Sequence, residues 1–253
     1  MIRTLDLGGD KLLAGAKDHE PNPFLGWRAI RICLDRPDLF RTQLRALLRA
    51  SAHGPVRILL PMISAVEEVI QAVRLADQCK EDLRQASLPF DDTIQIGVMI
   101  EIPAAALIAG HLAAHVQFLS IGTNDLTGYT LAVDRMNERV ARLYAPAHPA
   151  VLQLIHATAA AGRRAQRHVG VCGEAAGDPL LVPLLLGLGV EELSVTPASL
   201  PRVKHLIRRL RFTEAAALAE AALAAPSAQD NNQRCAAFLK SVAPELDLQP
   251  VLA

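Results

Sequence analysis

Polar side chains gather just after a short apolar run in the middle of the chain. Residues 116–121 predict a buried parallel strand, and Asn124 and Asp125 follow it beyond a glycine. Asp125 offers a hard anionic oxygen, and Asn124 offers an amide that both donates and accepts hydrogen bonds. Arg135 has a planar fork that suits a phosphate or a carboxylate. Together these residue types predict a site for a divalent metal and an anionic substrate.

A second interpretation of the same residues involves no chemistry. Asn and Asp are common at helix caps, so Asn124 and Asp125 could belong to a solvated loop that caps the next helix. The residue types alone leave both interpretations open.

Glu101 adds a second carboxylate at the end of another apolar segment. If Glu101 and Asp125 leave neighbouring strands at the same end, they can share one Mg²⁺ and leave coordination positions for substrate oxygens. Arg28 and Arg135 would then bind phosphate oxygens in bidentate fashion. The alternative is that the two carboxylates form salt bridges with Arg28, Arg57 or Arg135.

Cys172 stands at the end of an apolar run in the segment GVCGE, where Gly170 and Gly173 allow a ligand to approach closely. A thiol there could donate a proton to a developing carbanion or act as a nucleophile. Lone cysteines are usually buried packing residues, and we expect that role for Cys33, Cys79 and Cys235. The spacing of the four cysteines indicates neither a zinc site nor a disulfide framework, which favours a reduced cytosolic compartment.

The elements that must position these residues are short apolar strands that alternate with helical segments. We expect strands at residues 2–7, 56–62, 94–102, 116–121, 169–172 and 191–196. Nearly continuous apolar strands separated by helices predict a parallel sheet covered by helices, as in a TIM-type barrel, where chemistry collects at the carboxyl ends of the strands. Those ends carry Asp10, Glu101, Asn124, Asp125, Cys172 and Glu174.

Composition and apolar run lengths limit the partners, the location and the domain organisation that we expect for the chain. The chain has 253 residues, with 26 basic residues balanced by 26 acidic ones, so no basic field argues for nucleic acid. The longest apolar run, residues 180–190, is short and interrupted by proline and glycine, so we expect no membrane insertion and a cytoplasmic location. We expect residues 1–225 to form the sheet domain and residues 226–253 to form a C-terminal helical tail.

Four motifs in the same order identify a family. The segments NPFLGWRAIRI from Asn22, GVMIEIPAAA from Gly97, LSIGTNDLTGYTLAVDR from Leu119 and GVCGEAAGD from Gly170 closely resemble the phosphoenolpyruvate-binding carboxyl-terminal domain of enzyme I. Enzyme I is the phosphoenolpyruvate-protein phosphotransferase of the bacterial sugar phosphotransferase system, and the same module is found in multiphosphoryl transfer proteins. The resemblance runs from Ile2 to about Ala225.

The resemblance implies a TIM (β/α)8-type barrel with Mg²⁺ bound by Glu101 and Asp125. It further implies that Cys172 protonates the enolate carbon to give pyruvate. The residues that it assigns to phosphoenolpyruvate binding are Arg28, Asn124, Asp125 and Arg135. In the family the phosphoryl group passes to a histidine of a separate domain and then to a histidine phosphocarrier protein, and the resembled domain forms homodimers.

The sequence departs from the family pattern in three places. No segment matches the motif of the phosphorylatable histidine, so we expect the histidine domain to be missing from this sequence. The chain also begins at what resembles the third barrel strand, which predicts a barrel that lacks its first two β/α units. Gly128 occupies a position where glutamine is common in the family.

These departures keep other functions open. One alternative is a regulatory or assembly module that binds phosphoenolpyruvate without turnover. Another is a Mg²⁺-dependent lyase or aldolase on a similar barrel, since such enzymes share a metal site made of two carboxylates.

Overall fold

A computed structural model describes residues 1–6 and 22–246 and divides the chain into two compact units. The first unit comprises Met1–Ile100 and His111–Leu119, and the second comprises Glu101–Gly110 and Ser120–Ala253. Asp10, which we expect at the end of the first strand, lies outside the described residues.

Parallel strands form the sheet in the order in which they occur along the chain, β1-β2-β3-β4-β5-β6. Where the register is defined, β1 with β2, β2 with β3, and β5 with β6 all pair in parallel. The strands are β1 (Ile2–Arg3), β2 (Arg57–Leu60), β3 (Gln95–Ile100), β4 (Phe118–Gly122), β5 (His168–Cys172) and β6 (Glu192–Leu193). All of β4 is buried, as are β2 and β3 after their first residues, which explains their uninterrupted apolar sequences. The predicted fold class, α/β with parallel strands and helices as in a TIM-type barrel, is confirmed for residues 1–6 and 22–246, whose sheet has six strands.

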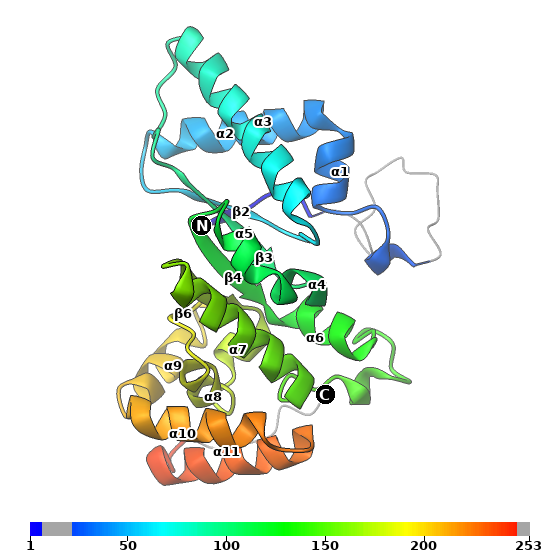
Figure 1. The fold of residues 1–253 in the computed structure, drawn as a ribbon. Coiled ribbons are helices and arrows are strands. Elements are labelled where there is room, and N and C mark those ends of the chain that lie inside the picture. The colour runs from blue at the N-terminus through cyan, green and yellow to red at the C-terminus, as the bar shows by residue number, and fades with distance from the viewer. Residues whose placement is uncertain (7–21, 247–253) are drawn as a thin grey trace. The chain divides into compact units, whose positions relative to one another are not determined.

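Helices of the first unit pack beside one another, and Figure 1 shows α2 and α3 in contact. The helical elements of this unit are η1 (Pro23–Leu25), α1 (Ile30–Asp35), α2 (Pro37–Ser51) and α3 (Val66–Gln85). Glu68 fixes the start of α3, because its carboxylate accepts hydrogen bonds from the backbone N–H groups of Ser64 and Ala65, at 2.6 and 2.9 Å. Arg41 of α2 donates to Asp82 of α3 at 2.6 Å and so joins the two helices.

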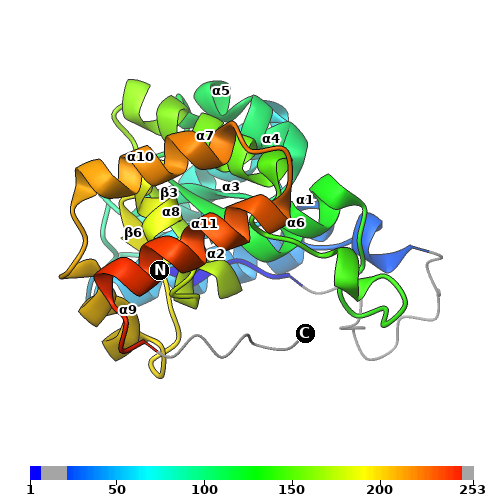
Figure 2. The same cartoon turned by 90° about the horizontal axis from the view of Figure 1, so that it is seen from below.

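The second unit contains most of the remaining helices. They are α4 (Pro103–Leu107), α6 (Thr123–Leu131), η2 (Ala141–Leu143), α7 (Pro149–Arg164), η3 (Glu174–Gly177), α8 (Val182–Gly187), α9 (Leu200–Ile207), α10 (Phe212–Leu223) and α11 (Ala228–Val242), while α5 (Ala109–Ala113) spans the division between the units. Figure 2 shows α10 and α11 side by side. A Cβ on Gly187 would overlap the backbone of Ala215, so the glycine lets α8 and α10 approach closely.

The last helix shares a hydrophobic core with its own unit. Leu239 and Ala243 of the α11 region are buried together with Val182, Val203 and Leu206. The helix that we expect beyond residue 226 is therefore present as α11, whereas a domain boundary at residue 225 stays a prediction.

Within residues 1–6 and 22–246, no helix combines the length and the apolar character that crossing a membrane requires.

Candidate functional site

The polar residues after β4 form the first turn of α6. Helix α6 begins at Thr123, directly after the strand, so Asn124 and Asp125 are helical residues, and the N-cap position belongs to Gly122. The backbone N–H groups of a first turn have no partners within the helix, and the helix dipole is positive there. The carboxylate of Asp125 is favourable at this position, and so would be an anionic ligand.

Two hydroxyl groups of β4 and α6 contact Cys172 at the end of β5. The Thr123 hydroxyl donates to the backbone carbonyl of Cys172 at 3.0 Å. The Ser120 hydroxyl donates to the Cys172 sulfur at 3.5 Å. Cys172 is half-buried, whereas Cys33, Cys79 and Cys235 are buried, which confirms the different packing predicted for these three. A partly accessible thiol with a hydroxyl donor beside it is suited to proton transfer.

Gly173 makes the close approach of β5 to α6 possible. Its φ of 96° lies in the region that residues with a side chain rarely adopt. A Cβ on Gly173 would stand 2.5 Å from the Thr123 hydroxyl oxygen and 2.8 Å from Oδ1 of Asn124. Both the backbone conformation and the lack of space for a Cβ therefore require glycine at position 173.

Asn124 and Arg135 both contact Glu174, the first residue of η3. Arg135 Nη1 lies 2.6 Å from Glu174 Oε1. Asn124 Nδ2 lies 3.5 Å from the same oxygen, at the outer limit of a hydrogen bond. The backbone N–H of Glu174 also donates to Asn124 Oδ1 at 3.0 Å. The structure thus brings Asn124, Arg135 and the end of β5 together.

Tyr144 also contacts this group. Its hydroxyl donates to the backbone carbonyl of Asn124 at 3.4 Å. Burial raises the pKa of the Tyr144 phenol; Glu174 and Asp125 act in the same direction, while the positive charge of Arg135 opposes them. The phenol therefore stays protonated and remains a hydrogen-bond donor.

Glu101 and Asp125 leave elements that pack against each other within the second unit. Glu101 lies between β3 and α4 with 3% of its surface exposed, and α4 contacts α6, which holds Asp125. Among the described residues, no group of three or more His, Cys, Asp or Glu side chains could hold a metal ion. Mg²⁺ usually takes only one or two carboxylates and fills its remaining positions with water and substrate oxygens, so this pair fits Mg²⁺ by donor type and number.

Arg28 belongs to the first unit, whereas the other predicted site residues belong to the second. Its guanidinium donates to both carboxylate oxygens of Asp6, with Nη2 at 3.0 Å from Oδ1 and 3.1 Å from Oδ2. Both side chains are buried, and the guanidinium also stands 5.9 Å from the centre of the Phe24 ring. Arg28 thus pairs with Asp6, and Arg135 pairs with Glu174. A role for Arg28 in substrate binding stays a prediction.

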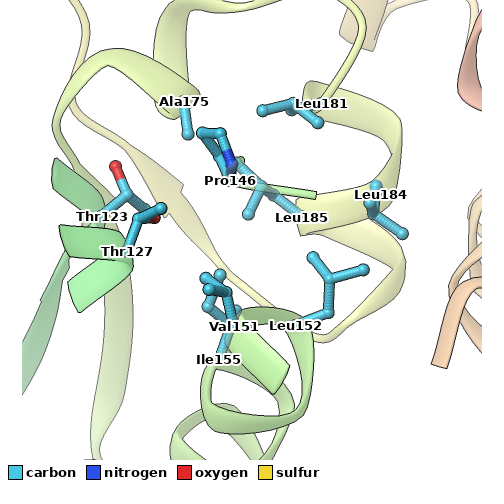
Figure 3. Close-up of a pocket in the computed structure, with 10 residues that line it drawn as sticks. All are labelled: Thr123, Thr127, Pro146, Val151, Leu152, Ile155, Ala175, Leu181, Leu184 and Leu185. Carbon is cyan, nitrogen blue, oxygen red and sulfur yellow. The ribbon is translucent and has the colours of Figure 1, made fainter. Parts of the chain in front are cut away.

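A small cavity lies beneath the first turn of α6. Figure 3 shows Thr123 and Thr127 on one side of it, facing apolar side chains of α7 and α8. Its volume of about 10 Å³ corresponds to a single water molecule. The cavity is therefore a small packing defect next to α6, and it is too small for an organic substrate. The remaining lining residues are Pro146, Val151, Leu152, Ile155, Ala175, Leu181, Leu184 and Leu185.

Several contacts of this site could not be predicted from the sequence. The segment GVCGE contains Gly173 and Glu174, so their position at a strand end was visible, but their contact with Asn124 was not. Tyr144 lies in an irregular segment beyond η2, and no local pattern marks it. Ser120 and Thr123 belong to the β4–α6 segment, but no local pattern indicates that their hydroxyl groups contact Cys172.

Comparison with known proteins finds one matching family. The model of the PEP-binding domain of PEP-utilising enzymes matches residues 1–212. Phosphoenolpyruvate-protein phosphotransferase of Latilactobacillus sakei is 49% identical over 235 residues, which cover 92% of this chain and 41% of that protein. The protein of the same name from Haemophilus influenzae is 49% identical over 240 residues, covering 94% and 42%, and that from Mycoplasma pneumoniae is 46% identical over 241 residues, covering 95% and 41%. The chain thus spans about two fifths of the length of these relatives.

Among solved structures, a citrate lyase from Burkholderia xenovorans aligns over 81% of this chain and 69% of its own, with 17% identity and a TM-score of 0.49.

Proposed function

The chain belongs to the family of PEP-utilising enzymes through their PEP-binding domain, and on that premise we propose that it binds phosphoenolpyruvate together with Mg²⁺. It would support phosphoryl transfer to a histidine of a separate domain and release pyruvate, as part of a sugar phosphotransferase system. The relatives named phosphoenolpyruvate-protein phosphotransferase support this reaction. A histidine phosphocarrier protein would receive the phosphoryl group from that separate domain.

One observation supports the proposal most directly. Asn124 and Arg135 point hydrogen-bond donors at a single anionic oxygen, Oε1 of Glu174, at the end of β5 beside Cys172. Two donors that converge on one anionic oxygen form the kind of site that a phosphoryl group requires. The thiol stands two residues away along the chain, so anion binding and proton donation would occur at the same strand end.

The carboxylates complete the proposed site. Glu101 and Asp125 would hold Mg²⁺, which when bound would neutralise part of the charge of the phosphoryl oxygens. Arg135 and Asn124 would orient the phosphoryl group by hydrogen bonds, and Arg28 is proposed to bind it as well.

Cys172 is the proposed proton donor. The bond between phosphorus and the bridging oxygen breaks as the phosphoryl group passes to the histidine nitrogen, and the electron pair of that bond stays on the enolate of pyruvate. The thiol proton of Cys172 moves to the enolate carbon, and the thiolate then regains a proton from solvent. The Ser120 hydroxyl that donates to the sulfur would stabilise the thiolate in the interval.

Calorimetric titration with phosphoenolpyruvate and Mg²⁺ tests binding. We expect binding to the native chain, its loss in Glu101→Ala, and unchanged binding in Glu67→Ala, which removes an exposed glutamate of α3. If the native chain binds no phosphoenolpyruvate, the proposal is wrong.

Turnover requires a second experiment, in which a purified histidine domain is added and pyruvate is measured. We expect pyruvate release that depends on the added domain and disappears in Cys172→Ala. Release without any histidine domain would instead indicate lyase or hydrolytic chemistry. Binding without release in the presence of a competent histidine domain would indicate a module that binds the ligand and does not turn it over.

We also propose that the chain acts as a homodimer in the cytoplasm. Exposed apolar side chains on neighbouring elements of the second unit, Leu200, Ile207 and Phe212, support association. Sedimentation velocity measures the state directly, and a stable monomer at high protein concentration would contradict the dimer.

A further inference from the structure

We propose that Glu174 is a positioning residue that serves as an internal counter-ion of the anion site. Its carboxylate holds Arg135 and Asn124 in their binding arrangement, and an anionic ligand displaces it when it binds. The inference rests on the proposed function, because the displacing group would be the phosphoryl group of phosphoenolpyruvate. It adds a role for a residue that the proposed chemistry does not use.

The contacts of Glu174 define the position of the anion. Arg135 Nη1 and Asn124 Nδ2 approach the same atom, Oε1 of Glu174, at 2.6 and 3.5 Å. The guanidinium contact is short and charge-assisted, whereas the amide contact is long and weak. One carboxylate oxygen thus occupies the point at which the two donors converge, and a phosphoryl oxygen could take the same place.

The backbone fixes the orientation of the Asn124 amide. The N–H of Glu174 lies 3.0 Å from Oδ1 of Asn124, and a backbone N–H can only donate. The acceptor end of the amide is therefore used within the protein, which leaves its NH₂ group turned toward the anion position. The hydrogen bond from the Thr123 hydroxyl to the Cys172 carbonyl holds the start of α6 beside the end of β5. The absence of a Cβ at Gly173 allows this close spacing.

Exposure makes the ion pair exchangeable. The side chain of Glu174 is 74% exposed and that of Arg135 is 40% exposed. Solvent screens such pairs, so they contribute little to stability and can be replaced at low cost. A phosphoryl dianion brings more charge and more acceptor oxygens to the arginine fork than the single carboxylate does, and so it would displace Glu174.

The counter-ion would have two effects on ligand choice. It would keep the long Arg135 side chain ordered before a ligand binds, which reduces the entropy lost on binding. It would also compete with weakly bound monoanions, so that a small carboxylate gains little from Arg135 while a phosphate still binds. Glu174 would therefore favour phosphorylated ligands over simple carboxylates.

Alkylation of Cys172 tests this inference without phosphoenolpyruvate. Iodoacetate carries a carboxylate and iodoacetamide does not. The rate of alkylation by iodoacetate divided by the rate of alkylation by iodoacetamide therefore reports how strongly positive charge near the Cys172 thiol attracts an anion. Dividing the two rates removes effects on thiol reactivity that both reagents share. The variants are Glu174→Gln, Arg135→Gln and their combination, with Glu220→Gln, an exposed glutamate of α10, as the matched control.

We expect Glu174→Gln to raise the ratio about twofold to fivefold, which is the range that an exposed ion pair contributes. Glu220→Gln should leave the ratio at its native value, and the combined variant should return to the value of Arg135→Gln alone. Unfolding midpoints equal to that of the native chain will show that the variants are folded. A ratio in Glu174→Gln that equals the native ratio overturns the inference, and so does a rise that persists without Arg135.

Titration with phosphoenolpyruvate and Mg²⁺ separates this inference from the proposed function. We expect Glu174→Gln to bind phosphoenolpyruvate with equal or higher affinity, because removing the competing carboxylate should offset or outweigh the loss of order at Arg135. If the native chain does not bind phosphoenolpyruvate but the alkylation ratio rises as expected, the proposed function fails and the counter-ion role stands. If phosphoenolpyruvate binds and the ratio does not change, the counter-ion role fails alone.

Discussion

A Cβ on Gly173 would stand 2.8 Å from Oδ1 of Asn124, so the end of β5 and the first turn of α6 can meet only where no side chain separates them. The same contact sets the distance between the thiol of Cys172 and the donors on α6, because Gly173 follows the cysteine directly.

We expect Gly173→Ala to lower the free energy of unfolding by about 1–3 kcal/mol, because alanine is strained at this backbone conformation and also meets Thr123 and Asn124. Urea denaturation measures the change. Gly54→Ala is the control, since a Cβ there meets nothing within 4 Å. Equal stability of the two variants would contradict the close contact.

The buried ion pair between Arg28 and Asp6 gives a prediction for the first unit. Asp6→Ala removes the carboxylate that faces the buried guanidinium and should destabilise the fold by about 3–5 kcal/mol. Asp77→Ala removes an exposed carboxylate of α3 and should have little effect. Thermal unfolding of both variants measures the difference, and similar midpoints would show that the pair contributes nothing.

Asn231 connects α11 to the segment before α7. Its side chain is fully buried, and Nδ2 donates to the carbonyl of Ala147 at 2.9 Å. We expect Asn231→Ala to cost about 1–3 kcal/mol, because the buried carbonyl loses its donor. Its exposed neighbour provides the control, Asn232→Ala. Urea denaturation of the two variants also tests the predicted boundary at residue 225, since an independent tail would tolerate both changes equally.

Cysteine reactivity should single out Cys172. Burial raises the pKa of Cys33 to about 11 and that of Cys235 to about 12, and it also raises the pKa of Cys79. A raised thiol pKa leaves little reactive thiolate near neutral pH, and burial excludes the reagent as well. Brief treatment with iodoacetamide followed by peptide mass spectrometry should find the label at Cys172, whereas urea-unfolded chain should be labelled at all four cysteines. Comparable labelling of the folded chain at Cys235 would contradict its burial.

The raised pKa of Asp178 predicts that the stability of the folded chain depends on pH. Burial raises the pKa of its carboxyl above the ordinary 3.8, while a hydrogen bond from the Leu180 N–H and the charge of Arg202 oppose the shift. The folded state therefore binds a proton more readily than the unfolded state, so this group favours folding at low pH and that contribution is lost as the pH rises through the folded pKa.

Asp178→Asn keeps an oxygen that can accept from Leu180 and removes the cost of the buried charge. We expect the variant to be more stable than the native chain near neutral pH, with an advantage that shrinks as the pH falls toward the ordinary carboxyl pKa. Urea denaturation across this pH range measures it. Asp77→Asn, in an exposed position of α3, should show no such trend. An advantage that grows on acidification would contradict the raised pKa.

The order of strands and helices was predictable from local patterns. Continuous apolar runs predicted β2, β3 and β4, because such runs are typical of strands that are buried on both faces. Element ends were less predictable. The strand expected at residues 191–196 is reduced to Glu192–Leu193.

The amino-acid sequence by itself determined the kinds of groups available and the strand ends that present them: Asn124, Asp125 and Cys172 each follow an apolar run that local pattern alone identifies. Only the tertiary structure decided how those groups pair. Glu174 meets Asn124 across 50 positions of the chain, and Arg28 meets Asp6 across 22. The reason is physical: periodicity records burial within one element, whereas contacts between distant residues depend on which strands lie side by side and on how closely a residue such as Gly173 lets them approach.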